Sequence, residues 1–166
     1  MDLAAQSSAV NTALTLELPD LAATHGLAAR LAAVIRGGDL ITLRGELGIG
    51  KSELARALIR AYAGSMLEVP SPTFTIVQDY ALEGQLTIRH VDLYRIEDPD
   101  ELFELGLEEQ PSDAEAWLVE WPERAGGRLA PASLEITLED GATAESRTAH
   151  LSHIPALTSR LGNLAP

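Results

Sequence analysis

Apolar residues recur along the chain at two spacings, and the two spacings predict different elements. Leucines that alternate with polar residues over 14–18 indicate a β-strand, whereas a helix beginning after Asp20 has one apolar face, formed by Leu21, Leu27, Leu31 and Val34. Over the whole chain these patterns predict helices at 20–35, 51–64, 98–107 and 156–161. They predict strands at 14–18, 39–43, 86–93, 116–121, 133–138 and 146–151, and another that begins at Phe74.

Two turns containing glycine indicate that some neighbouring strands form hairpins. Glu83-Gly84 separates the strand beginning at Phe74 from the next, and Asp140-Gly141 separates the last two strands. Hairpins are antiparallel, so the sheet cannot be uniformly parallel. With 166 residues, 46% of them hydrophobic, we expect a single domain over 1–166 with a loose tail at 1–13. The predicted fold class is α/β with a mixed parallel and antiparallel central sheet.

Composition narrows the functional classes. The formal charge is −13, which disfavours broad binding of nucleic acid by the protein alone, although acidic charge also serves solubility. No cysteine is present, which excludes disulfides, thiolate metal sites and a thiol nucleophile. The N-terminal stretch lacks the features of a signal peptide, and no apolar run approaches the length of a membrane span. We therefore expect a cytoplasmic protein.

The stretch from Leu43 to Ile59 carries the sharpest chemical signal. It contains the phosphate-binding pattern G-x-x-x-x-G-K-S between a predicted strand and a predicted helix, which is the context that this motif requires. Glycines allow the backbone to turn so that successive N–H groups form an anion nest at a helix N-terminus. A chance glycine-rich turn is the alternative. The expected nucleotide-binding residues of the loop are Gly45, Glu46, Leu47, Gly48, Ile49, Gly50, Lys51 and Ser52.

Lys51 is the only lysine in the chain, and the other eleven of the 12 Lys and Arg residues are arginines. A compact ammonium group fits between phosphates where a planar guanidinium does not. The retention of a single lysine at this position favours phosphate binding over a chance turn. Ser52 would supply a hydroxyl ligand for Mg²⁺. We therefore expect a P-loop NTPase-like fold of three layers that uses ATP and Mg²⁺.

Acidic residues end two predicted buried strands. Asp92 follows LTIRHV and Glu120 follows AWLV, which places both at the sheet edge where open α/β folds bind ligands. Either is a candidate to hold Mg²⁺ and to orient the attacking water, and each could equally be a simple strand-end acid.

Three further residues lie near these positions in the sequence. Thr73 follows the stiff segment Pro70-Ser71-Pro72 and precedes the strand expected from Phe74. It could sense the terminal phosphate or could be an ordinary strand-start threonine. Trp121 follows Glu120 and is either a core or interface aromatic or part of the site. His90 has no histidine or cysteine partner at metal-binding spacing, so we assign it to packing or hydrogen bonding.

The motifs GELGIGKS, SPTFTIVQDY, HVDLYR, LGLEE and LVEWPE occur in this order, and together they resemble the TsaE family. The resemblance covers residues from about Leu21 to Glu123. It implies the ATPase component of the bacterial machinery that installs threonylcarbamoyladenosine on tRNA, acting in a complex with TsaD and TsaB.

The resemblance also implies roles for individual residues. Lys51 and Ser52 would bind phosphate and Mg²⁺, and Thr73 would be a switch-like threonine. Asp92 and Glu120 would serve Mg²⁺ and water, and Trp121 would be an aromatic residue whose loss damages function. The chain departs from the family in having serine after the lysine and Ile49 where alanine is usual; the serine keeps the hydroxyl, whereas Ile49 is bulkier.

Two other functions compete with this one. A small-molecule kinase suits the length and the loop, but the sequence offers no arginine-bearing lid, and two hairpins disfavour the kinase sheet. A GTPase would read guanine through N-K-x-D, which needs a second lysine; because the only lysine is Lys51 of the loop, this function is excluded. Because no arginine finger is evident, we expect slow ATP hydrolysis by the isolated protein.

Overall fold

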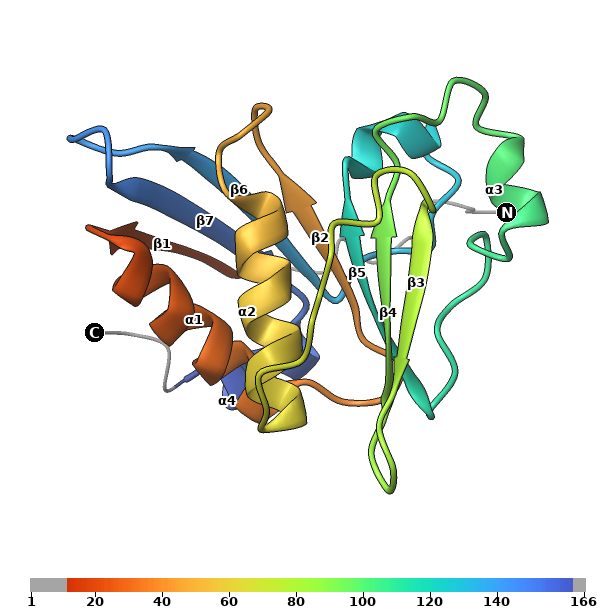
Figure 1. Cartoon of the computed structure of the whole chain (residues 1–166), viewed down its shortest axis with the longest axis horizontal. Coiled ribbons are helices and arrows are strands. Elements are labelled where there is room, and N and C mark those ends of the chain that lie inside the picture. The colour runs from red at the N-terminus through yellow and green to blue at the C-terminus, as the bar shows by residue number, and fades with distance from the viewer. Residues whose placement is uncertain (1–11, 163–166) are drawn as a thin grey trace, which may run out of the picture.

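A computed structural model describes residues 12–162, which form one seven-stranded sheet with helices packed on it (Figure 1). The strand order is β1-β7-β6-β2-β5-β4-β3. The strands are β1 (Thr12–Leu18), β2 (Leu40–Arg44), β3 (Val77–Ala81), β4 (Thr87–Asp92), β5 (Glu115–Glu120), β6 (Leu134–Asp140) and β7 (Arg147–His153).

The predicted mixture of parallel and antiparallel pairing is confirmed. β6, β2, β5 and β4 form a parallel block at the centre. The β3–β4 and β6–β7 pairs are the two antiparallel hairpins, and β1 pairs antiparallel with β7 at the opposite edge from β3. The carboxyl ends of β2, β5 and β4 therefore lie beside one another at one end of the sheet.

One face of the sheet is covered by α1 (Leu21–Val34), α2 (Lys51–Ala63) and α4 (Pro155–Leu161) (Figure 1). Their buried side chains share one hydrophobic core with alternate residues of the strands, including Ile41 and Leu43 of β2. Asp20 begins α1 by accepting a hydrogen bond from Ala23 N at 2.8 Å, as expected of an N-cap. Gly64 ends α2 in the left-handed conformation.

The other face of the sheet carries a second, smaller core. It contains the intervening strand residues, such as Leu40 and Trp117, because successive side chains of a strand point to opposite faces. The covering layer consists of the segment 93–107 with the four-residue helix α3 (Glu101–Glu104), and the 3₁₀ helix η1 (Pro122–Ala125). The sheet thus has a full helical layer on one face and a layer of short helices and loops on the other.

The structure corrects four details of the sequence prediction. The chain does not enter a strand at Phe74, because residues 72–76 turn and β3 begins only at Val77. The helix predicted at 98–107 is reduced to α3. Leu21 is exposed and does not join the buried face of α1. Residues 12–13 belong to β1, so the predicted tail ends earlier; residues 1–11 lie outside the described part of the chain.

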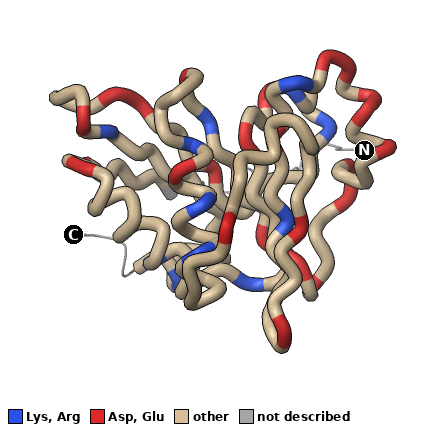
Figure 2. Tube along the Cα trace, viewed as in Figure 1, with Lys and Arg blue, Asp and Glu red and all other residues tan. Residues whose placement is uncertain are grey.

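Acidic residues are spread over the molecule, with a run of them around α3 (Figure 2). Within residues 12–162, no helix combines the length and the apolar character needed to cross a bilayer.

Candidate nucleotide site

The glycine-rich loop connects the carboxyl end of β2 to the first residue of α2, as the motif predicts. Gly50 is the N-cap of α2 at φ +119°, a conformation that side chains with a Cβ rarely adopt. Gly45 is constrained twice: its φ is +141°, and a Cβ there would lie 2.6 Å from the carbonyl oxygen of Leu138. Both glycines are therefore required by the path of the loop.

Ile49, the bulky residue in the loop, packs into the core between the sheet and the helices. Its side chain is only 7% exposed, and its carbonyl oxygen accepts a hydrogen bond from Arg147 Nε at 2.8 Å. Arg147 lies at the start of β7, so both contacts attach the loop to the body of the domain. Ile49 thus anchors the loop from beneath and does not line the pocket that contains Lys51.

Lys51, the first residue of α2, lies buried against the loop. Its ammonium nitrogen Nζ donates hydrogen bonds to the carbonyl oxygens of Gly45 at 2.6 Å and Glu46 at 2.8 Å. It also lies 4.1 Å from the centroid of the Trp121 ring, within the range of a cation–π contact. Burial lowers the pKa of Lys51, although the charges of Glu120, Glu123, Asp92 and Glu46 oppose this shift.

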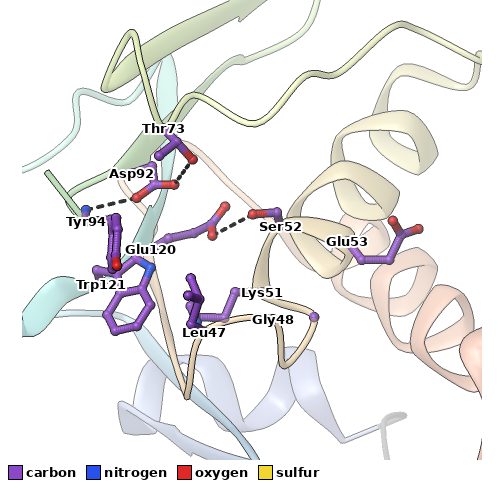
Figure 3. A pocket seen from close by; sticks show the side chains of 11 residues that line it. Leu47, Gly48, Lys51, Ser52, Glu53, Thr73, Asp92, Tyr94, Glu120 and Trp121 are labelled. Atoms are coloured by element: carbon purple, nitrogen blue, oxygen red, sulfur yellow. Dashed lines mark hydrogen bonds between the residues drawn. The ribbon is translucent and has the colours of Figure 1, made fainter. Parts of the chain in front are cut away.

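The two strand-end acids lie side by side. β4 and β5 are adjacent parallel strands in which Asp92 pairs in register with Glu120, so both side chains emerge from the same face of the sheet. Glu120 Oε2 accepts a hydrogen bond of 2.9 Å from the hydroxyl of Ser52, the second residue of α2 (Figure 3). The structure therefore brings together the predicted Mg²⁺ ligands Ser52, Asp92 and Glu120, which come from three different elements.

Thr73 joins this group through Asp92. Its hydroxyl donates to Asp92 Oδ2 at 2.8 Å, while Asp92 Oδ1 accepts from the backbone N–H of Tyr94 at 2.9 Å (Figure 3). Thr73 lies in the turn that precedes β3, where the N–H of Ile76 bonds to Pro72 O at 2.6 Å and Ile76 has φ +67°. The strand-start interpretation of Thr73 is thus wrong, and the turn places its hydroxyl over the carboxylate.

Trp121 follows β5 but leaves the strand in a left-handed conformation, with φ +57°. This turn directs the chain into η1 and places the indole beside the ammonium group of Lys51. The ring of Tyr94 lies 5.0 Å from the Trp121 ring, centroid to centroid, and the two aromatic residues form one wall of the pocket (Figure 3).

The sequence analysis did not name Tyr94 as a site residue, and it assigned His90 to packing or hydrogen bonding without naming its partner, which is a site residue. His90 is 1% exposed, and its Nε2 lies 2.7 Å from Glu120 Oε1. The spacing H-x-D on one strand is a signal that was available, since residues two apart on a strand share a face. Sequence alone did not show that this face also receives Glu120 from the neighbouring strand.

One open pocket collects Lys51, Ser52, Thr73, the two strand-end acids and the two aromatic residues, whereas His90 lies outside its lining. Its lining consists of Leu47, Gly48, Gly50, Lys51, Ser52, Glu53, Thr73, Asp92, Tyr94, Glu120 and Trp121. A second hollow lies across the loop, between the start of α1 and the β6–β7 hairpin. It is lined by Leu21, Thr24, Gly48, Ile49, Gly50, Glu53, Leu138, Glu145 and Arg147.

The donor set suits Mg²⁺ bound together with a phosphate. Among the described residues, no cluster of three or more His, Cys, Asp and Glu side chains is arranged to hold a metal ion unaided. Mg²⁺ is commonly bound through one or two carboxylates with further oxygens from substrate phosphates and water. Two carboxylates and a hydroxyl beside the glycine-rich loop match that mode of binding.

Comparisons with known proteins place the chain among TsaE proteins. A family model described as "Threonylcarbamoyl adenosine biosynthesis protein TsaE" matches residues 18–149. The tRNA threonylcarbamoyladenosine biosynthesis protein TsaE of Rickettsia felis is 38% identical over 116 residues, covering 70% of this chain and 67% of that protein. The TsaE protein of Bacillus subtilis is 35% identical over 116 residues, covering 70% and 71%.

A solved structure agrees with the sequence comparisons. The crystal structure of Bacillus subtilis YdiB superposes with a TM-score of 0.70 at 25% sequence identity, covering 93% of this chain and 94% of that one. The predicted resemblance is therefore confirmed, and the chain belongs to the TsaE family of threonylcarbamoyladenosine biosynthesis proteins.

Proposed function

We propose that this protein binds and hydrolyses ATP with Mg²⁺ through a P-loop NTPase-like site, and that it supports threonylcarbamoyladenosine modification of tRNA by acting on a complex of TsaD and TsaB. The observation that carries the proposal is the 2.9 Å hydrogen bond between Ser52 and Glu120. It joins the hydroxyl next to the anion nest to an acid at the end of a neighbouring strand, which is the pairing that phosphoryl-transfer sites use around Mg²⁺.

In this proposal the phosphates occupy the pocket on the α2 side of the loop. The loop N–H groups and the N-terminus of α2 face the phosphate oxygens, and Lys51 neutralises the outer phosphates. Burial strengthens that interaction because it removes competing water from the ammonium group. The hollow on the other side of the loop, with Leu21 and Leu138 in its lining, offers apolar surface for the nucleoside.

The acids and Thr73 have separate roles. Ser52, Asp92 and Glu120 would hold Mg²⁺, which neutralises charge that develops on the phosphate oxygens when it is bound. A Glu120 carboxylate oxygen accepts a hydrogen bond from the attacking water and orients it. Thr73 is anchored on Asp92, so its turn responds to whatever the carboxylate binds.

The composition of the pocket supports a requirement for a partner protein. No arginine occurs among the described residues that line it, so the charge of the transition state lacks an arginine finger. Hydrolysis by the isolated protein is therefore slow, and contact with TsaD and TsaB accelerates it. The net charge of −13 is consistent with a protein that binds other proteins and does not itself bind tRNA broadly.

The test is phosphate release from ATP, measured for the protein alone and with TsaB and TsaD, alongside tRNA modification in the same reconstituted mixture. We expect slow release alone, faster release with the partners, and modification that depends on both ATP and this protein. Fast turnover alone would count against the partner role. Phosphate that appears on an added metabolite rather than as the free ion would indicate a small-molecule kinase instead.

A further inference from the structure

A buried histidine lies behind the candidate site. His90 of β4 and Glu120 of β5 are each 1% exposed, and 2.7 Å separates Nε2 of the histidine from Oε1 of the acid. The other carboxylate oxygen, Oε2, accepts the Ser52 hydroxyl at 2.9 Å. The two oxygens of Glu120 therefore have different partners, one in the sheet and one at the start of α2.

Strand register explains how the histidine reaches the acid. His90 pairs with Leu118 and Asp92 pairs with Glu120 across the parallel β4–β5 ladder. Residues two apart share a face, so His90, Asp92 and Glu120 all project toward α2. His90 precedes Asp92 by two residues on β4; Asp92 lines the pocket, whereas His90 lies outside the lining and its Nε2 meets Oε1 of Glu120.

The surroundings of the ring favour one tautomer. In the part of the chain that the structure describes, the Nδ1 atom of His90 is buried and has no hydrogen-bonding partner. A buried N–H without an acceptor is costly, and an ionised carboxylate can only accept hydrogen bonds. A ring with its proton on Nε2 and none on Nδ1 satisfies both conditions, so His90 donates to Glu120.

We propose that His90 is a positioning residue for Glu120. Its Nε2–H fixes the carboxylate so that Oε2 faces Ser52 and the place of the metal; the inference rests on the proposed function. A packing role alone would be served better by an apolar side chain, which would leave no buried nitrogen without a partner. Partners that orient a metal-ligating group from behind typically change metal affinity or activity 10- to 100-fold when removed.

The experiment compares the wild-type protein with His90→Leu and His90→Gln, each with TsaB and TsaD. Leucine keeps apolar volume and removes the donor, whereas the terminal amide of glutamine can donate from the position of Nε2. We expect His90→Leu to raise the Mg²⁺ concentration for half-maximal hydrolysis by about tenfold, while ATP affinity measured in EDTA stays within about twofold. His90→Gln should recover most of the wild-type Mg²⁺ dependence.

Two outcomes would overturn the role of His90 while wild-type hydrolysis remains intact. In the first, His90→Leu needs the same Mg²⁺ concentration for half-maximal hydrolysis as the wild type. In the second, both variants lose ATP affinity in EDTA by the same factor as they lose Mg²⁺ dependence. A wild type without Mg²⁺-dependent hydrolysis would instead refute the proposed function. Nitrogen NMR of the wild-type protein gives a test that does not depend on the folding of a variant. His90 should carry a proton on Nε2, and a ring protonated on Nδ1 alone would overturn the proposal.

Discussion

Replacing Arg160 by alanine should cost about 3–5 kcal/mol of the free energy of unfolding, the usual loss when one partner of a buried ion pair is removed. Arg160 lies on α4, and its NH1 and NH2 donate to the two carboxylate oxygens of Asp39 at 2.8 and 3.0 Å. Its NH1 also donates to the carbonyl oxygen of Val34 at 2.9 Å. The side chains of Arg160 and Asp39 are only 13% and 8% exposed, so water reaches little of either partner.

The magnitude follows from what remains after the substitution. The carboxylate of Asp39 would keep one hydrogen bond, from the backbone N–H of Arg36 at 2.8 Å, and its charge would be left buried. The same change would remove the hydrogen bonds of the Arg160 side chain from α4 to Val34 and Asp39. A loss of about 3 kcal/mol or more is a large fraction of a typical stability of about 5–15 kcal/mol.

Urea unfolding followed by circular dichroism provides the assay. With a slope of about 1–3 kcal/mol/M, the midpoint should fall by about 1 M or more. Arg128→Ala is the matched control, because Arg128 pairs with Asp100 and Glu108 at the surface, where such pairs contribute about 0–1 kcal/mol. Equal midpoint shifts for the two variants would refute the reasoning. A double change that also replaces Asp39 by alanine should lose less than the sum of the two single changes.

Three further predictions concern the loop and α2. Lys51→Ala should abolish most ATP binding, whereas Glu120→Ala should mainly slow hydrolysis. If the assigned roles are wrong, titration with a fluorescent ATP analogue would show equal binding defects in the two variants. Gly45→Ala should lower stability by more than about 1 kcal/mol, because the backbone conformation and a carbonyl of β6 exclude a Cβ, whereas Gly26→Ala in α1 meets open space and should be neutral or stabilising in thermal unfolding. A hydrogen bond from the His25 side chain lowers the pKa of Glu53, so this pair stabilises the fold above the unfolded pKa of about 4.5, and the stabilisation is lost as the pH falls through the lower folded pKa. The wild type should therefore be more stable than Glu53→Gln at pH 7 and lose that advantage at pH 3. A difference in unfolding midpoint that stays constant between these pH values would contradict this.

Most elements of the fold follow from local patterns, and so their prediction succeeded. Alternating and helical spacing identify the strands and helices, and the two glycine turns identify both hairpins. The stretch at Phe74 failed because its β-branched residues have strand propensity, whereas a turn held by Pro72 and Ile76 prevails in the folded chain. Strand propensity is a weak guide where tertiary contacts decide the backbone.

The sequence by itself determined the glycine-rich loop, its flanking strand and helix, and the family, because each depends on residues close together in the chain or on motifs in serial order. Only the tertiary structure decided which side chains meet. Parallel pairing of β4 with β5 places His90, Asp92 and Glu120 on one face, and α2 brings Ser52 to them. Contacts between residues 30 to 68 positions apart are set by strand order and register, which local patterns do not specify.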